Sequence, residues 1–245
     1  MEYFGGRQVV LEALRSGHKI HRLYLGDPRI LKGELGTLAE KAGLQGEVCP
    51  AALQEKMEGS QGILAYGESF SYRNPEDFLE SLSKSQGCLV VVLDHLEDPH
   101  NLGAIIRTAL CAGAAGIVIP DDRSVRVTQT VLKVSAGAAF HLPIVKVSNI
   151  ATYLKKMKEE GFWVYGADMA GPSGLYETAL SGRIALVAGN EGKGISPLVK
   201  KSCDVLISIP QEGPLGSLNV SVATGLILYE AMRQRRYLHG RIQGS

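Results

Sequence analysis

The sequence predicts an α/β protein of two unequal domains, a small α/β unit followed by a larger unit built on a parallel sheet. Its 245 residues exceed what one compact core usually holds. After residue 87, runs of apolar and β-branched residues alternate with helical stretches, and a polar stretch separates them from the first unit. We therefore predict a first domain over residues 1–67, a linker over 68–86 and a second domain over 87–245.

The composition is that of an ordinary globular protein. Hydrophobic residues make up 45% of the chain and charged residues 21%. No apolar run reaches the roughly 18–20 residues that a membrane helix needs, and the start lacks the layout of a signal peptide. We therefore expect a cytoplasmic protein that does not enter a membrane. The 4 cysteines are scattered without a Cys-x-x-Cys pair, so neither a metal site nor a disulfide framework is predicted.

The net charge of +1 gives the chain no general attraction to nucleic acid. Any contact with nucleic acid must come from local basic patches, although such clusters are more often solvated surface. The candidates are Arg7, Arg15, Lys19 and Arg22 near the start and Arg233, Arg235, Arg236 and Arg241 near the end.

The first domain alternates short helical and extended patterns. The spacing of its apolar residues predicts helices over 7–14 and 31–42 and extended segments over 22–25 and 62–66. Residues 68–86 are rich in Ser, Glu and Asn, and their apolar residues are too sparse to predict a core element. This polar stretch is the predicted linker.

The second domain has the pattern of a parallel sheet covered on both faces, because continuous apolar strands alternate with helices. One helix is predicted over 149–160, with Asn149 as its cap, and the longest is predicted over 219–236. The predicted strands are 89–93, 116–119, 143–145, 162–165, 184–187 and 205–209. Sheets of this kind bind ligands at the carboxyl ends of their strands, so we expect the loops at those ends to carry the function.

The loop after the first of these strands leads into a helix with two candidate functional residues. Asn101 is a candidate helix cap, and Arg107 follows in the second turn. A lone Arg on such a helix is usually a surface residue, but a position just beyond the carboxyl end of a strand favours a functional role. His95 and His100 flank the loop without the spacing of metal ligands, so we predict no metal.

A second loop, residues 188–197, is rich in glycine. Glycines let a backbone approach a ligand closely, and the turn also contains two polar side chains; the residues concerned are Gly189, Asn190, Glu191, Gly192 and Gly194. The glycines alone are equally consistent with a simple tight turn. Their spacing fits neither a P-loop nor a dinucleotide-binding fold, which argues against ATP and NAD.

A third loop, residues 209–223, is rich in proline and glycine and leads into the longest helix. The free backbone N–H groups at the start of a helix can hold the polar edge of a ligand. Ser217 is either a simple cap of that helix or a ligand contact, and Asn219 lies close by in the sequence.

Taken together, three segments resemble the motifs of the SpoU (TrmH) family in their order. They are Asp98-Pro99-x-Asn101-Leu102-Gly103-Ala104-x-x-Arg107-Thr108-Ala109, Gly189-x-Glu191-Gly192-x-Gly194 and Ile209-Pro210-x-x-Gly213-x-x-x-Ser217-Leu218-Asn219-Val220-Ser221-Val222-Ala223. The match spans residues 93–231, whereas residues 5–14 resemble the opening of the family's L30-like RNA-binding domain. One departure is Gln211, where the family commonly has Met.

The resemblance implies an S-adenosylmethionine-dependent RNA ribose 2′-O-methyltransferase that acts as a homodimer. Its catalytic domain would be tied in a trefoil knot, and the L30-like domain ahead of it would bind the RNA. The implied catalytic residues are Arg107, Asn101, Glu191, Ser217 and Asn219, and the implied cofactor contacts are Gly189, Ile209, Leu218, Asn190 and Ser217.

The same resemblance favours ribosomal RNA as the substrate, with a guanosine of 23S rRNA as the expected target, because tRNA-specific relatives usually lack the first domain. A tRNA substrate stays open as an alternative, and so does a catalytically silent RNA-binding or assembly factor. The retention of Arg107, Glu191, Ser217 and Asn219 argues against the silent factor, whereas a failure to bind S-adenosylmethionine would favour it.

Overall fold

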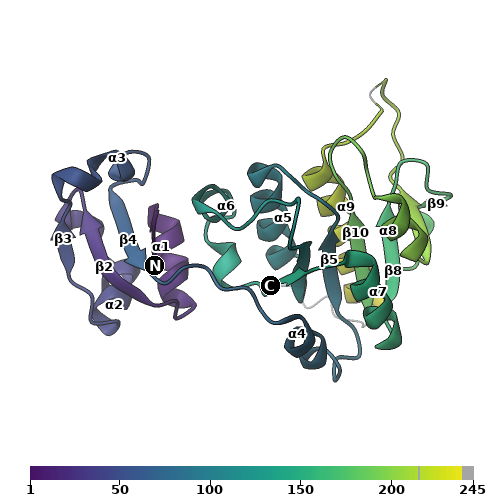
Figure 1. The fold of residues 1–245 in the computed structure, drawn as a ribbon, viewed down its shortest axis with the longest axis horizontal. Helices are drawn as coiled ribbons and strands as arrows, with labels where there is room; N and C mark the ends of the chain where they lie inside the picture. The colour runs from purple at the N-terminus through teal and green to yellow at the C-terminus, as the bar shows by residue number, and fades with distance from the viewer. Residues whose placement is uncertain (215, 239–245) are drawn as a thin grey trace. The chain divides into compact units, whose positions relative to one another are not determined.

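The computed structural model describes residues 1–214 and 216–238 and divides into two compact units (Figure 1). The first unit comprises Met1–Ser71 together with Arg126–His141, and the second comprises Tyr72–Val125 and the chain from Leu142 onward. This division differs from the predicted boundaries. Residues 68–71 belong to the first unit and residues 72–86 to the second, so no separate linker lies between them, and residues 126–141 belong to the first unit.

A mixed four-stranded sheet forms the centre of the first unit. Its strands, in the order β1-β4-β2-β3, are β1 (Glu2–Gly5), β4 (Ile63–Gly67), β2 (Ile20–Leu25) and β3 (Gly46–Val48), and its helices include α1 (Arg7–Arg15), α2 (Glu34–Lys41) and α3 (Gln54–Met57), with short 3-10 turns at Pro28–Ile30 and Ala51–Leu53. The predicted helices and extended segments of this unit are confirmed. The sequence pattern does not predict β1 or β3; all of β3 is exposed, so it shows no apolar alternation.

Residues 126–141 add α6 (Gln129–Val134) and a 3-10 turn (Ala138–Phe140) to the core of the first unit. The centroid of the Phe140 ring lies 5.5 Å from that of Phe4 and 4.7 Å from that of His18. His141 Nε2 lies 2.7 Å from a carboxylate oxygen of Glu12 on α1. These contacts join residues far apart in the sequence, which explains why no local pattern assigns this segment to the first unit.

The second unit is built on a seven-stranded parallel sheet, as predicted. Its strands, in spatial order, are β7 (Ile144–Val147), β6 (Gly116–Pro120), β5 (Leu89–Leu93), β10 (Ile184–Ala188), β8 (Trp163–Ala167), β11 (Val205–Ser208) and β9 (Ser173–Gly174). All the predicted strands of this domain are confirmed, and each predicted end lies within two residues of the observed end. Only the two-residue edge strand β9 has no counterpart in the prediction, because it is too short to show a period.

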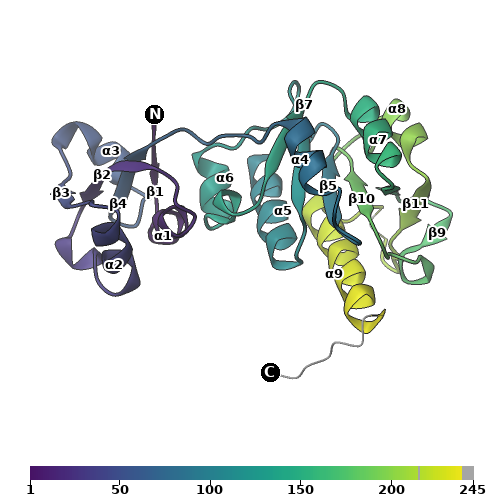
Figure 2. The ribbon, with the colours of Figure 1, turned by 90° about the horizontal axis from the view of Figure 1, so that it is seen from below.

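Helices cover both faces of this sheet (Figure 2). On one side lie α4 (Pro75–Ser81), α7 (Ile150–Glu159) and α8 (Pro197–Ser202), and on the other lie α5 (Pro99–Cys111) and α9 (Val220–Leu238). Val90 and Val92 of β5 pack into the cluster beneath α4 and α7. Successive strand residues alternate between faces, so the equally buried Val91 points toward the α5 side. The predicted cap of α7 is confirmed, because Asn149 Oδ1 accepts a 2.9 Å hydrogen bond from Thr152 N.

The prediction that residues 68–86 contain no core element is wrong. Helix α4 lies in this stretch and begins after Asn74, whose side chain accepts hydrogen bonds from Glu76 N and Asp77 N. Its apolar side chains are buried in the second unit's core, Phe78 at 4% and Leu79 at 9% exposure. Two turns of helix bring these side chains to one face, although they are sparse in a polar sequence.

The order of the strands brings the last helix of the second unit back against its second helix. From β10 it passes through α8 to β11, on the far side of β8, and then returns so that α9 packs against α5. Such a return is needed for the expected trefoil knot, and the threading itself stays a prediction. Within the described residues, no helix is long and apolar enough to cross a membrane.

Candidate active site

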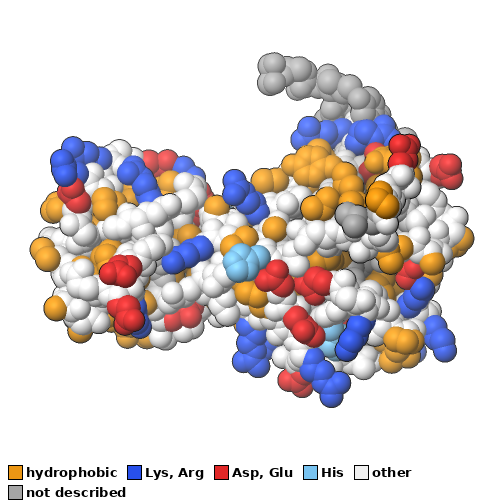
Figure 3. Space-filling model, turned by 90° about the horizontal axis from the view of Figure 1, so that it is seen from above, with side chains coloured by type: hydrophobic (Ala, Val, Ile, Leu, Met, Phe, Trp, Pro, Cys, Tyr) orange, Lys and Arg blue, Asp and Glu red, His pale blue; other side chains and the backbone are white. Residues whose placement is uncertain are grey.

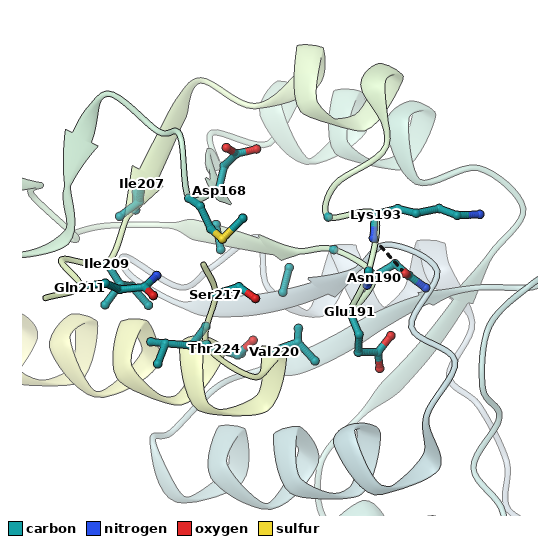
Figure 4. Close-up of a pocket in the computed structure, with 18 residues that line it drawn as sticks. Asp168, Asn190, Glu191, Lys193, Ile207, Ile209, Gln211, Ser217, Val220 and Thr224 are labelled. Atoms are coloured by element: carbon teal, nitrogen blue, oxygen red, sulfur yellow. Dashed lines mark hydrogen bonds between the residues drawn. The ribbon is translucent and has the colours of Figure 1, made fainter. Parts of the chain in front are cut away.

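A pocket opens at the carboxyl edge of the central strands (Figure 4). Its cavity volume is about 280 Å³, and it is open to the solvent. Residues 167–169 after β8, residues 188–194 after β10, the end of β11 and the start of α9 form its walls. The pocket therefore lies where a doubly wound sheet is expected to bind a ligand.

The loop of residues 189–194 forms a tight cradle on one side of the pocket. Asn190 and Gly194 exchange two backbone hydrogen bonds of 3.0 and 2.9 Å. A Cβ on Gly189 would lie 2.1 Å from the carbonyl carbon of Gly194, so no larger residue fits there. Asn190 Oδ1 accepts hydrogen bonds from Gly192 N at 3.0 Å and Lys193 N at 3.2 Å, which fixes the turn. The turn thus holds one wall of the pocket in a fixed conformation.

The expectation that Asn101 caps α5 is wrong. The cap is Asp98, which accepts a 2.9 Å hydrogen bond from His100 N, and Pro99 is the first helical residue. Asn101 lies in the first turn, and its side chain is free to join the three loops. Its Nδ2 donates to Glu191 Oε1 at 3.0 Å, and its Oδ1 accepts from Asn219 Nδ2 at 3.0 Å.

A buried carboxylate also links the first loop to the second. Asp94, at 1% exposure, accepts hydrogen bonds from Ser196 N at 2.7 Å and lies 2.6 Å from Nδ1 of His95. The backbone of His95 has a φ of 60°, and its carbonyl accepts a 3.0 Å hydrogen bond from Asn190 Nδ2. The sequence pattern does not single out Asp94, since a carboxylate after a strand has many structural uses.

The third loop supplies Ile209, Ser217 and Leu218 to the pocket wall, together with Gln211. Ser217 does not cap α9, because the helix begins at Val220 and it is Asn219 Oδ1 that accepts a 2.8 Å hydrogen bond from Ser221 N. The simple-cap interpretation of Ser217 is therefore wrong. The predicted cofactor contacts and Glu191 all lie on this one pocket.

Arg107 lies apart from these residues. It is exposed in the third turn of α5 rather than the second, and it does not line the pocket of its own chain. Sequence reasoning also missed Asp168 and Met169 on the pocket wall, although their position just after β8 could have indicated them. Asp168 pairs with Lys200 at 2.6 Å, and this hydrogen bond holds the pKa of the Asp168 carboxyl below its usual value.

Several candidates for basic patches are already paired within the protein. Arg15 contacts carboxylate oxygens of Glu12 and Glu34, each at 2.6 Å, and Arg233 contacts Glu230 at 2.7 Å. Only part of each predicted patch is therefore open to a nucleic acid. Lys19 is exposed and lies 3.7 Å from a carboxylate oxygen of Glu68. Of the other candidates, Arg7, Arg22 and Arg236 are exposed, Arg235 is partly buried, and Arg241 lies outside the described residues.

The fold and the site together define an α/β enzyme with a backbone-lined ligand pocket at the carboxyl edge of a parallel sheet. The model of the SpoU rRNA Methylase family matches residues 88–229. YacO of Bacillus subtilis (strain 168), whose name assigns it to the TrmH family of tRNA/rRNA methyltransferases, is 39% identical over 240 residues, 96% of each chain. The chain belongs to the SpoU (TrmH) family.

Solved structures agree in fold over nearly the whole chain. The SpoU methyltransferase AviRb from Streptomyces viridochromogenes, in complex with the cofactor AdoMet, is 26% identical with a TM-score of 0.80, covering 95% of this chain and 89% of its own. An RNA 2′-O ribose methyltransferase is 26% identical with a TM-score of 0.73, covering 95% and 88%. The protein is an RNA ribose 2′-O-methyltransferase that uses S-adenosylmethionine.

The pocket fits this cofactor. S-adenosylmethionine has a flat aromatic base and a charged, polar tail, and the pocket is lined by both apolar and polar residues. A Cβ on Gly189 would collide with the backbone of Gly194 and Ile195, so glycine at this position lets the loop close on itself beside the pocket. No group of three or more potential metal ligands occurs within residues 1–214 and 216–238.

Proposed function

We propose that this enzyme methylates the 2′-hydroxyl of a ribose in large-subunit ribosomal RNA, with a guanosine of 23S rRNA as its target. The observation that carries the proposal is the convergence of three sequence-distant loops on one pocket through the Asn101 side chain. The description of the matching family model supports the ribosomal substrate. The presence of a separate first unit, which is proposed to recognise the RNA, supports it further.

The cofactor contacts in this proposal are Gly189, Asn190, Ile209, Ser217 and Leu218, all of which line the pocket. The cofactor supplies a methyl group on a positively charged sulfur. The rigid 189–194 loop and the start of α9 hold it in one orientation, which lowers the entropic cost of an in-line transfer. Apolar side chains of Ile209 and Leu218 exclude water from the base.

Asn101, Glu191 and Asn219 are proposed to orient the ribose. A ribose hydroxyl is a weak nucleophile, so its proton must be accepted and its oxygen held in line with the methyl group. Glu191 Oε1 is held by Asn101, and no residue of the described chain is seen to bond Oε2, which leaves Oε2 to accept the hydroxyl proton in a hydrogen bond. Asn101 is itself fixed by Asn219, so the carboxylate is oriented from two loops.

Arg107 is proposed to contact the RNA backbone and to stabilise the developing negative charge. Its guanidinium stays protonated in water, so electrostatic stabilisation suits it better than the role of a base. It is exposed and forms no ion pair within the described part of the chain, so its planar fork can bind a phosphate. Arg107→Ala should greatly reduce methyl transfer, whereas wild-type turnover by this variant would refute the assignment.

A homodimer is also proposed, formed through the face of α9. Val222, Leu226 and Tyr229 recur on one side of this helix at exposures of 50%, 39% and 46%. The space-filling view shows a group of hydrophobic side chains on one face of the second unit (Figure 3). Because α5 packs beside α9, a second copy on this face would also lie near Arg107.

The dimer is tested by light scattering. The wild-type protein is expected at twice the 26.3 kDa of a single chain. Leu226→Glu is expected to shift the mass to a single chain, because it places a charge in the apolar stripe. Leu198→Glu, at a more exposed apolar residue on α8 outside the stripe, is the control and should stay dimeric. A wild-type protein with the mass of one chain contradicts the dimer.

The substrate is tested by transfer of labelled methyl groups to unmodified 23S rRNA and to unmodified tRNA, followed by mapping of the labelled position. Label at one guanosine of 23S rRNA supports the proposal. The name of the Bacillus relative includes both tRNA and rRNA as substrates. Label in tRNA alone would support ribose methylation but contradict ribosomal RNA as the substrate. Label in neither RNA, together with failure to bind the cofactor, would support a silent RNA-binding factor.

A further inference from the structure

Thr224 presents a buried hydroxyl group without a hydrogen-bond partner at the pocket. Its side chain is 1% exposed, and no hydrogen-bond partner for Oγ1 is found in the described structure. A threonine inside a helix commonly donates to the carbonyl four residues earlier, but Thr224 makes no such bond. Because an unpaired buried hydroxyl is destabilising, its position at a ligand pocket suggests that the ligand supplies the missing partner.

The surroundings of Thr224 suit a flat, largely apolar group. Met169, Ile207, Ile209 and Leu218 line the same pocket. In the close-up, Val220 and Thr224 on α9 lie below Ser217, on the side of the pocket that faces Ile209 (Figure 4). The next residue, Gly225, lies on the face of α9 that packs against α5, where a Cβ on Gly225 would lie 3.4 Å from Thr108. Water therefore has little access to the hydroxyl from behind.

We propose that the Thr224 hydroxyl donates a hydrogen bond to a ring nitrogen of the cofactor's adenine and so positions the cofactor. The adenine is the flat part of S-adenosylmethionine, and its ring nitrogens N1, N3 and N7 accept hydrogen bonds. The inference rests on the cofactor assignment and adds a positioning residue that the sequence motifs do not single out. Thr224 acts on binding and does not touch the transferred methyl group.

Thr224→Val separates the hydroxyl from the shape of the side chain, because valine has the same size but no donor. Binding of S-adenosylhomocysteine is measured by calorimetry, and the melting temperature is measured without ligand. We expect about tenfold weaker binding, together with a higher melting temperature of the free protein because the unpaired hydroxyl is gone. Thr224→Ser keeps the donor and should bind within about twofold of wild type.

Deaza analogues of S-adenosylhomocysteine identify the nitrogen. Among the 1-deaza, 3-deaza and 7-deaza compounds, one should bind the wild-type protein more weakly, and for that compound the Thr224→Val variant should show no further loss. Wild-type affinity of Thr224→Val for S-adenosylhomocysteine overturns the Thr224 assignment and leaves the cofactor assignment intact. A lower melting temperature of free Thr224→Val also overturns it, because the hydroxyl would then have a partner inside the protein.

Discussion

Replacing Phe78 with Ala should destabilise the second unit by about 3–5 kcal/mol, the usual range for a buried Phe. Phe78 is 4% exposed, and its ring atom Cζ lies 2.6 Å from where a Cβ on Gly116 would stand. Gly116 has no side chain that could move into the vacated space, so the cavity should persist. The upper half of the range is therefore expected, because the cost grows with the volume that stays empty.

Trp163 on β8 provides the assay. It is the only tryptophan of the chain and belongs to the second unit, so its fluorescence in urea follows the unfolding of that unit. Phe78→Ala should lower the urea midpoint without changing the slope. Glu80→Ala, at an exposed position of the same helix, is the control and should stay within about 0.5 kcal/mol of wild type. A wild-type midpoint for Phe78→Ala would refute the place of α4 in the core.

Further predictions concern the first helix cap, the glycine cradle and a thiol. Asp98→Ala should cost about 1 kcal/mol in the urea assay because it removes the cap of α5; no change would argue against that cap. Gly189→Ala places a Cβ 2.1 Å from Gly194 and should abolish cofactor binding in calorimetry. Gly192→Ala is the control, because a Cβ there has its nearest neighbour at 3.8 Å, and it should retain binding. Equal binding by both variants would contradict a requirement for glycine at position 189. Burial raises the pKa of Cys203 to about 12, so only about one thiol in ten thousand is ionised at pH 8. Mass mapping should find Cys203 unmodified after brief iodoacetamide treatment of the folded protein, and rapid labelling would contradict its burial.

The second sheet could be predicted from sequence because its strands are continuous apolar runs, such as 89–93, that stay recognisable without any tertiary information. The elements that were missed lack such a signal. Helix α4 has few apolar residues, and β3 is entirely exposed. The position of residues 126–141 depends on ring contacts of Phe140 with residues more than a hundred positions away, and a local pattern contains no information about them.

The candidate site was predicted mainly from its loops, since three strand ends carry glycine or small polar residues at one edge of the sheet. What each side chain does there was harder to predict. The sequence pattern predicts Asn101 as the cap of α5, but Asp98 caps the helix instead. The Asn101 side chain forms hydrogen bonds with Glu191 and Asn219. Thr224 looks like an ordinary helix residue, and only burial of its hydroxyl without a partner distinguishes it.

The central claim is that the pocket transfers a methyl group to a ribose oxygen. The most direct test is digestion of RNA methylated by the enzyme to nucleosides, followed by identification of the labelled nucleoside by chromatography and mass spectrometry. Label is expected only in a 2′-O-methyl nucleoside, with a strong loss of that label for Glu191→Gln. Label on a base, with the ribose unmodified, would contradict ribose methylation.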